Sequence, residues 1–186
     1  MAPSSGEANR ETFEGLYNQH RLQILAYCNR RLDQTLAPDA CSEVFLVAWR
    51  RYEEIPDPPE SLFYLYGIAA KVVANQRRSM RRKVRLDAKL RNIGVAPSDD
   101  PSAMLIRSEQ DRWVERAVAK LNPTDREIVM LYAWEELSRE EISKVMGMSR
   151  SAIDQRIHRA YRRLARRLAP AVPQLAHDPL THGGNR

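Results

Sequence analysis

Cysteine is almost absent from this chain of 186 residues, which contains only Cys28 and Cys41. Their spacing fits neither a disulfide framework nor a zinc site, so we expect two buried thiols in a reducing compartment. Glycine is also scarce, at seven residues, and no glycine-rich phosphate loop occurs. The four histidines are scattered, and none stands at a catalytic spacing from a cysteine or an aspartate. We therefore expect no enzymatic activity, no cofactor and no metal site.

Long apolar runs and alternating patterns are missing as well. No segment approaches the roughly 20 apolar residues that span a bilayer, and the start, MAPSSGEANR, lacks the apolar core of a signal peptide. We therefore expect a cytoplasmic protein without membrane insertion. No segment alternates apolar and polar residues between turn signals, which disfavours strands. From Glu11 onward apolar residues recur at steps of three and four, so the predicted fold class is all-α.

Clusters of proline, glycine and polar residues divide the chain into segments. EIPDPPES, at 54–61, is predicted as a loop, because its prolines remove amide donors and restrict the residues before them. A second cluster, with Gly94, Pro97 and Pro101, predicts a linker between two small helical domains. The predicted order is a disordered N-terminus, a first domain, a flexible linker, a second domain and a flexible tail, at 1–10, 11–84, 85–101, 102–169 and 170–186.

Positive charge is concentrated in two places. The formal net charge is +6, which favours an anionic partner, although the total charge alone does not distinguish nucleic acid from an acidic membrane surface. Eight basic residues and one acid lie between Gln76 and Arg91, and six arginines without an acid lie between Gln155 and Leu168. The ordinary alternative for each run is a charged helix face that contacts only water.

The segment LSREEISKVMGMSRSAIDQRIHRA has the pattern of a helix-turn-helix. Ser138 and Glu141 form a predicted capping box at the start of its first helix. Gly147 can take the left-handed conformation that ends this helix, and Ser149 can cap the helix that follows. The turn is then about three or four residues long, as a helix-turn-helix requires. The alternative is a plain helical hairpin whose second helix is basic.

Helical spacing predicts which edge of this second helix points outward. Ile153 and Ile157 are taken as the inward direction, with a turn of about 100° per residue. The outward set is then Ser151, Gln155, Arg159, Arg162 and Arg166. A helix-turn-helix inserts its second helix into the major groove with the N-terminus first, which would bring Arg150 to base edges and the later arginines to phosphates. Arg156 falls near the core boundary, where an arginine stem can lie along apolar surface.

Three segments resemble conserved regions of one protein family. The run 121–168 is similar to the fourth region of the extracytoplasmic-function sigma factors, a two-domain class of bacterial RNA polymerase specificity subunits, although other bacterial regulators share such a run. APDACSEVFLVAWRR, at 37–51, resembles the second region of the family, with Phe45 and Trp49 at matching places. LYGIAAKVVANQRRSMRRK, at 65–83, is similar to the next helix of that region. The N-terminal segments favour the sigma factors over other regulators.

The resemblance implies a sigma factor that binds core RNA polymerase and promoter DNA and directs promoter-specific transcription initiation. Its fourth region would recognise the minus-35 element, and its second region would bind the polymerase, recognise the minus-10 element and help melt the DNA. The resemblance also implies a monomer when free and an anti-sigma factor as a further partner. Asp154 departs from the family, which frequently has lysine at this position.

The same resemblance assigns three sets of site residues. For the minus-35 element they are Arg150, Ser151, Gln155, Arg156, Arg159, Arg162 and Arg163. For the minus-10 element they are Tyr64, Asn75, Arg77, Arg78, Arg81 and Arg82, with the 54–61 loop as a pocket for an extruded base and Tyr66 as an alternative stacking residue. For the polymerase they are Asp39, Glu43, Val47, Arg50 and Arg51. Aromatic residues at helical spacing are more often core, and acids near a helix start can simply interact with its dipole.

A rival interpretation is a helix-turn-helix repressor or activator that acts without the polymerase. It predicts a stable dimer on a palindromic DNA site, whereas a sigma factor binds promoters well only together with core polymerase. The segment 37–51 is the sequence feature that disfavours this rival. An enzyme that acts on nucleic acid is disfavoured further, because no paired carboxylates precede a metal motif and no glycine-rich phosphate loop occurs.

Overall fold

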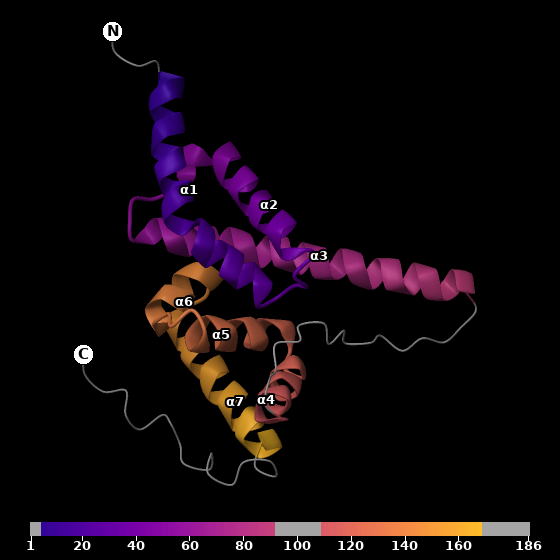
Figure 1. The fold of residues 1–186 in the computed structure, drawn as a ribbon. Helices are drawn as coiled ribbons and strands as arrows, with labels where there is room; N and C mark the ends of the chain where they lie inside the picture. The colour runs from indigo at the N-terminus through magenta and orange to yellow at the C-terminus, as the bar shows by residue number, and fades with distance from the viewer. Residues whose placement is uncertain (1–4, 92–108, 169–186) are drawn as a thin grey trace. The chain divides into compact units, whose positions relative to one another are not determined.

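The computed structural model describes residues 5–91 and 109–168, and within these ranges the chain is entirely helical. It divides into two compact units, Met1–Ala103 and Met104–Arg186. The described residues form three α-helices in the first unit and four in the second, labelled α1 to α7 in Figure 1. The prediction of an all-α fold is confirmed for the residues described. No helix in this part of the chain is long and apolar enough to cross a membrane.

The N-terminal unit consists of three long helices and one short turn of 3-10 helix. Proline at the start of the second helix and the proline-rich loop before the third explain why the helices begin where they do. The elements are α1 (Ser5–Asn29), α2 (Ala37–Arg50), η1 (Tyr52–Glu54) and α3 (Glu60–Arg91).

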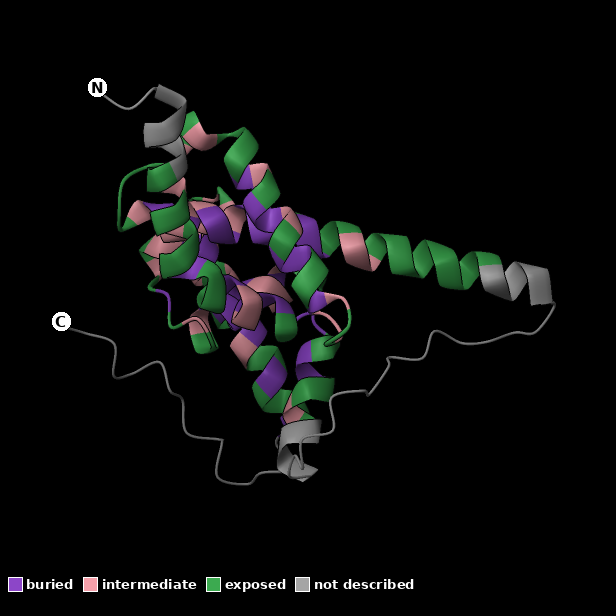
Figure 2. Cartoon of the chain, turned by 45° about the horizontal axis from the view of Figure 1, so that its top comes forward, coloured by how far each residue is buried: buried purple, intermediate pink, exposed green. Residues whose placement is uncertain are grey.

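The core of this unit lies where the three helices meet, as the buried residues in Figure 2 show. Ile24 and Tyr27 of α1, Val44 of α2, and Leu65 and Ala69 of α3 are fully buried. Burial of such side chains contributes about 1.5–3 kcal/mol each for the larger ones, so these contacts set how the helices pack.

Helix α3 is longer than the sequence pattern predicts. It continues to Arg91, although the linker was predicted to begin at residue 85. The segment RRSMRRKVRLDAKLR contains no glycine or proline that would end a helix. Residues 78–86 are all exposed, and Figure 1 shows this end of α3 projecting beyond α1 and α2. The basic segment 78–86 of α3 therefore presents its side chains to solvent.

The predicted N-terminus, linker and tail can be compared with the structure only in part. Helix α1 begins at Ser5, within the range 1–10 that was predicted to be disordered. The predicted tail, 170–186, and the part of the predicted linker from residue 92 onward lie outside the described residues.

The C-terminal unit contains α4 (Glu109–Ala119), α5 (Pro123–Ala133), α6 (Arg139–Met146) and α7 (Arg150–Leu168). Asn122 Oδ1 accepts a hydrogen bond from the amide of Asp125, at 2.8 Å, and caps α5. The predicted capping box at α6 is present, with the Ser138 amide donating to Glu141 at 2.7 Å and the Glu141 amide donating to Ser138 at 3.3 Å. Local sequence signals therefore determine where these two helices start.

The core of this unit is formed by branched apolar side chains from its successive helices. Ile128 of α5, Ile142 of α6, and Ile153 and Ile157 of α7 are almost completely buried. A neighbouring part of the core joins α4 to the C-terminal half of α7, through Val118 and other residues. The inward direction predicted for α7 is thus confirmed.

Gly147 ends α6 in the left-handed conformation, with a φ of 60°. Replacing it with alanine should lower the free energy of unfolding by about 1 kcal/mol, because a β-carbon is unfavourable in this region even where space is open. Thermal unfolding measures the effect. The control is Gly15→Ala on the exposed surface of α1, which should have the opposite sign. Equal midpoints for the two variants would contradict the argument.

Candidate nucleic-acid interface

The helix-turn-helix places one edge of α7 toward solvent. Ser149 Oγ accepts from the amide of Ala152, at 3.3 Å, and caps α7 as predicted. The amide of Met148 donates to Ser143 O at 3.2 Å, which closes the turn after α6. Opposite the buried isoleucines, six side chains form an exposed outer edge. They are Ser151, Gln155, His158, Arg159, Arg162 and Arg166.

On one flank of α7, two arginines contact a buried carboxylate of α5. Arg156 Nη1 lies 2.7 Å from Asp125 Oδ1, and Arg163 Nη1 lies 3.5 Å from Asp125 Oδ2. Asp125 is only 4% exposed and also accepts from Asn122 Nδ2 at 2.6 Å. Buried carboxylates are costly unless they are paired, so this pairing fixes the rotation of α7 relative to α5.

On the other flank, acids of α6 and α7 contact Arg150. Its guanidinium lies 3.5 Å from Glu140 and 3.7 Å from Asp154. Asp154 also lies 3.2 Å from Arg139, the first residue of α6. These pairs connect the beginning of α6 to the first turn and a half of α7.

The flanking pairs separate the seven predicted minus-35 residues into two groups. Within the described part of the chain, Ser151, Gln155, Arg159 and Arg162 lie on the outer edge without an ion-pair partner. The others, Arg150, Arg156 and Arg163, are paired with carboxylates of the protein. The prediction omitted His158 and Arg166, although Arg166 had been assigned to the outward edge by helical spacing. The outer edge therefore offers hydrogen-bonding groups first and cationic groups later along the helix.

A second basic surface lies on the exposed part of α3. Four arginines line a shallow groove there: Arg78, Arg81, Arg82 and Arg85. Asn75 Oδ1 accepts from Arg78 Nη2 at 2.8 Å, so these two predicted residues lie together. Arg85 was missed because the sequence pattern placed it in the linker. We call these four arginines the α3 arginine groove.

Arg77 differs from its neighbours on α3. Its Nη2 and Nε donate to the carbonyl oxygen of Arg31, at 2.8 Å and 3.2 Å, and it is half-buried. The guanidinium of Arg77 supplies hydrogen bonds to a backbone carbonyl just beyond the end of α1, and this contact joins α3 to the segment after α1. The structure thus separates Arg77 from the arginine groove, although the sequence prediction grouped them.

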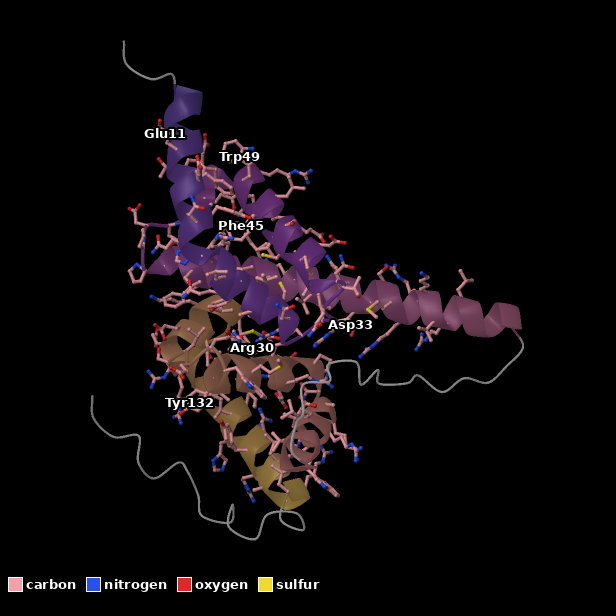
Figure 3. The ribbon with its side chains drawn as sticks, in the orientation of Figure 1. Glu11, Arg30, Asp33, Phe45, Trp49 and Tyr132 are labelled. Carbon is pink, nitrogen blue, oxygen red and sulfur yellow. The ribbon has the colours of Figure 1, made fainter. Side chains whose placement is uncertain are left out.

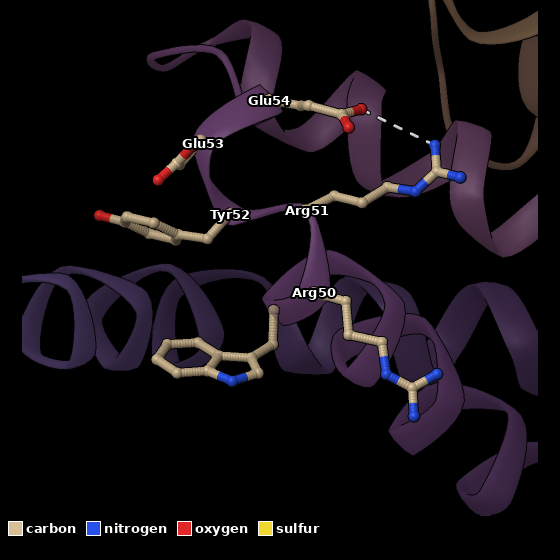
Figure 4. A pocket seen from close by; sticks show the side chains of 6 residues that line it. Arg50, Arg51, Tyr52, Glu53 and Glu54 are labelled. Carbon is tan, nitrogen blue, oxygen red and sulfur yellow. Dashed lines mark ion pairs between the residues drawn. The ribbon is translucent and has the colours of Figure 1, made fainter. Parts of the chain in front are cut away.

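The end of α2 and the short helix η1 form a pocket at the start of the 54–61 loop. Trp49, Arg50, Arg51, Tyr52, Glu53 and Glu54 line it, as Figure 4 shows. Tyr64 donates from its hydroxyl to Glu54 at 3.2 Å, and Arg51 lies 3.7 Å from the same carboxylate. Burial, and after it the carboxylate of Glu54, raises the pKa of the Tyr64 phenol. The phenol therefore stays a hydrogen-bond donor.

Tyr66 is buried, which makes the alternative stacking assignment wrong. Its ring lies 5.3 Å from the ring of Tyr27, and only 4% of the residue is exposed. Tyr64 and Tyr66 are separated by about 200° around the helix, so only one of them can face the core. Tyr64 is the partly exposed one.

Helix α2 presents a mixed face of acidic, apolar and basic side chains. Of the five predicted polymerase-binding residues, Asp39, Arg50 and Arg51 are exposed, and Glu43 and Val47 are half-buried. Gln76 Nε2 of α3 donates to Glu43 at 3.2 Å. Leu46, which the prediction omitted, is 49% exposed on the same helix.

The aromatic residues of α2 pack differently from one another. Phe45 is buried against Tyr17 of α1, with ring centres 4.8 Å apart. Trp49 contacts Phe13 at 5.0 Å and remains 41% exposed. Figure 3 shows both side chains directed from α2 toward α1. Trp49 therefore forms part of the surface, whereas Phe45 belongs to the core.

Other polar and thiol groups in the N-terminal unit have structural partners. His20 is buried, with Nε2 3.5 Å from Ser61 Oγ and Nδ1 2.9 Å from Gln23 Oε1, and it connects α1 to the start of α3. Cys28 and Cys41 are buried free thiols, as predicted, and burial raises the pKa of the Cys41 thiol. Within the described ranges, no group of three or more His, Cys, Asp or Glu side chains could hold a metal ion.

Comparison with known proteins assigns the family. Residues 111–164 match the model for sigma-70, region 4. The chain is 27% identical over 154 residues to RNA polymerase sigma factor YlaC of Bacillus subtilis, covering 82% of this chain and 89% of that protein. It is 30% identical over 166 residues to ECF RNA polymerase sigma factor ShbA of Streptomyces griseus, covering 82% and 85% respectively.

A solved structure shares the fold. The sigma factor RpoE of Bartonella quintana, in complex with the anti-sigma factor NepR, is similar with a TM-score of 0.63 and 19% identity, covering 87% of this chain and 99% of that one. The family is indicated by the region 4 match and by similarity over most of the length of the relatives, and the shared fold agrees with it. This chain belongs to the extracytoplasmic-function (ECF) RNA polymerase sigma factors.

Proposed function

We propose that this sigma factor contacts promoter DNA through two separate surfaces, one in each unit. The outer edge of α7 recognises the minus-35 element, and the α3 arginine groove, with Asn75 and Tyr64, contacts the minus-10 element and helps melt it. The observation that carries the proposal is the presence of an exposed, arginine-rich helix surface in each of the two units. Arginines on such surfaces neutralise phosphates, while a few hydrogen-bonding side chains distinguish bases.

The surface of α2 is proposed to bind core polymerase. The contacts are charged groups of both signs around the apolar Val47: Asp39, Glu43, Arg50 and Arg51. The exposed Leu46 and Trp49 support this assignment, because exposed large apolar side chains beside charged ones are typical of protein-binding surfaces. The region 2 domain is proposed to span 11–84 and the region 4 domain 102–169, with a linker between them.

The remaining properties follow from membership of the family and are also proposals. The protein acts in the cytoplasm as a binding factor rather than an enzyme, and it is a monomer when free. An anti-sigma factor is a proposed partner. The complex of the structurally similar RpoE with the anti-sigma factor NepR supports this partner class.

Run-off transcription with purified bacterial core polymerase tests the proposal on a pool of genomic fragments. We expect discrete start sites that require this protein, and their upstream sequences should share two separated elements. A variant with Gln155→Ala and Arg159→Ala should lose initiation at these sites by more than tenfold, because base and phosphate contacts are removed together. Sequence-specific binding of DNA by the protein alone, without new start sites, would instead support a regulator that acts without polymerase.

A further inference from the structure

The N-terminal end of α7 carries a row of alternating charges. Arg150 Nη1 lies 3.5 Å from Glu140 Oε2, and Arg150 Nε lies 3.7 Å from Asp154 Oδ2. Asp154 Oδ1 in turn lies 3.2 Å from Arg139 Nη1. Two residues of α6 and two of α7 therefore alternate in sign, in the order Glu140, Arg150, Asp154 and Arg139.

These contacts restrict the side chain of Arg150 more than they stabilise the fold. The side chains of Arg150 and Glu140 are 56% and 60% exposed, and ion pairs of this kind contribute at most about 1 kcal/mol. However, carboxylates from two different helices hold one guanidinium between them. An arginine that is already confined loses less rotamer freedom when it binds DNA. Nη2 of Arg150 has no carboxylate partner among the described side chains.

Asp154 is the better-fixed carboxylate of the two. Its Oδ1 is shielded from solvent and forms an ion pair with Arg139 but no hydrogen bond. Its Oδ2 forms the ion pair with Arg150. The six arginines between Gln155 and Leu168 attract phosphate, and an acid beside them weakens that attraction. Asp154 thus lowers affinity for DNA in general while it confines the first cationic side chain of the recognition helix.

We propose that Asp154 is a positioning residue for base recognition, which orients Arg150 toward a guanine in the upstream promoter element. The proposal rests on the proposed function of α7 in minus-35 binding. Arginine pairs in bidentate fashion with the O6 and N7 acceptors of guanine, and this contact depends on the direction of the guanidinium plane. An unconfined guanidinium can turn to the phosphates, which are the same for every sequence. Asp154 therefore acts on sequence preference.

The test uses the full chain in complex with core polymerase. The upstream element found by run-off transcription is randomised, and the bound sequences are counted. For the wild-type protein we expect guanine at one position. Asp154→Asn should reduce this preference about tenfold, equivalent to about 1.4 kcal/mol, without changing preferences at the downstream element. Arg150→Lys should reduce the preference at the same position, because lysine cannot make the bidentate contact.

Two controls separate positioning from charge and from folding. Glu136→Gln removes an exposed acid from the same unit, so it changes the net charge equally and should leave every preference unchanged. Asp154→Glu retains the carboxylate and should restore part of the guanine preference. All variants should match the wild-type thermal unfolding midpoint to within a few degrees, because the paired side chains are between 34% and 60% exposed and such ion pairs contribute little to stability.

The outcomes distinguish this proposal from the function on which it rests. An equal rise in affinity for all sequences in Asp154→Asn, with the guanine preference intact, would overturn the proposal and leave Asp154 as a repulsive charge. A reduced preference at a position that Arg150→Lys does not affect would also overturn it. A wild-type holoenzyme without any upstream preference would overturn the proposed role of α7 itself.

Discussion

Replacing Asp125 with alanine is expected to lower the free energy of unfolding of the C-terminal unit by about 3 kcal/mol. Removing one partner of a buried ion pair typically costs 3–5 kcal/mol, because the other charge is left without compensation. We expect a loss at the lower end of this range, because the Arg156 side chain is 31% exposed and can partly turn toward water. Denaturant unfolding, together with hydrogen exchange of the α7 amides, measures the loss.

A double-mutant cycle with Arg156→Ala identifies the source of this loss. We expect the two single substitutions to be coupled by about 0.5–3 kcal/mol, since residues of one ion-pair network do not behave additively. Glu136→Ala, at an exposed acid of the same unit, should change stability by less than about 0.5 kcal/mol. Additive effects of Asp125→Ala and Arg156→Ala would show that Asp125 stabilises the unit without this pair.

Replacing Arg78, Arg81 and Arg82 together with glutamine should weaken promoter binding by the holoenzyme about 100-fold at about 0.1 M salt. Each arginine that neutralises a phosphate releases bound counterions, and this contribution depends on the salt concentration. The slope of log affinity against log salt concentration should therefore become shallower by about 2–3 for the three charges. Equilibrium binding of a promoter fragment over a series of salt concentrations measures both quantities.

A triple variant elsewhere on the surface is the matched control for this experiment. Arg21, Arg116 and Lys120 are exposed and lie outside the proposed DNA-binding surfaces. Their replacement with glutamine removes the same charge but should leave the slope nearly unchanged. An equal change of slope in both variants would mean that total charge, rather than the α3 arginine groove, determines binding.

Several start and end signals of the C-terminal helices are local in the sequence. Asn122 caps α5, Ser138 and Glu141 form the capping box of α6, and Gly147 takes the left-handed conformation at its end. These interactions join residues within a few positions of each other, so nothing beyond the local chain is needed to specify them. The helical fold class and the outward edge of α7 follow in the same way from the spacing of apolar residues.

The end of α3 and the two tyrosines at its start were less predictable. Apolar spacing fades toward the end of α3, where residues 78–86 are exposed, although the backbone remains helical to Arg91. Tyr64 and Tyr66 are the same residue type, but Tyr64 is partly exposed and Tyr66 is buried. Apolar residues occur on both sides of α3 near its start, so periodicity does not reveal which tyrosine faces the core.

By itself the sequence determined the helices, their caps, the two basic regions and the family to which the chain belongs. Only the tertiary structure decided which arginines of those regions are held by partners elsewhere in the fold. Arg156 and Arg163 are paired with Asp125, Arg150 lies between Glu140 and Asp154, and Arg77 binds a carbonyl oxygen. The physical reason is that an ion-pair partner on another helix is set by how the helices pack, whereas a cap or an apolar stripe is set by neighbours along the chain.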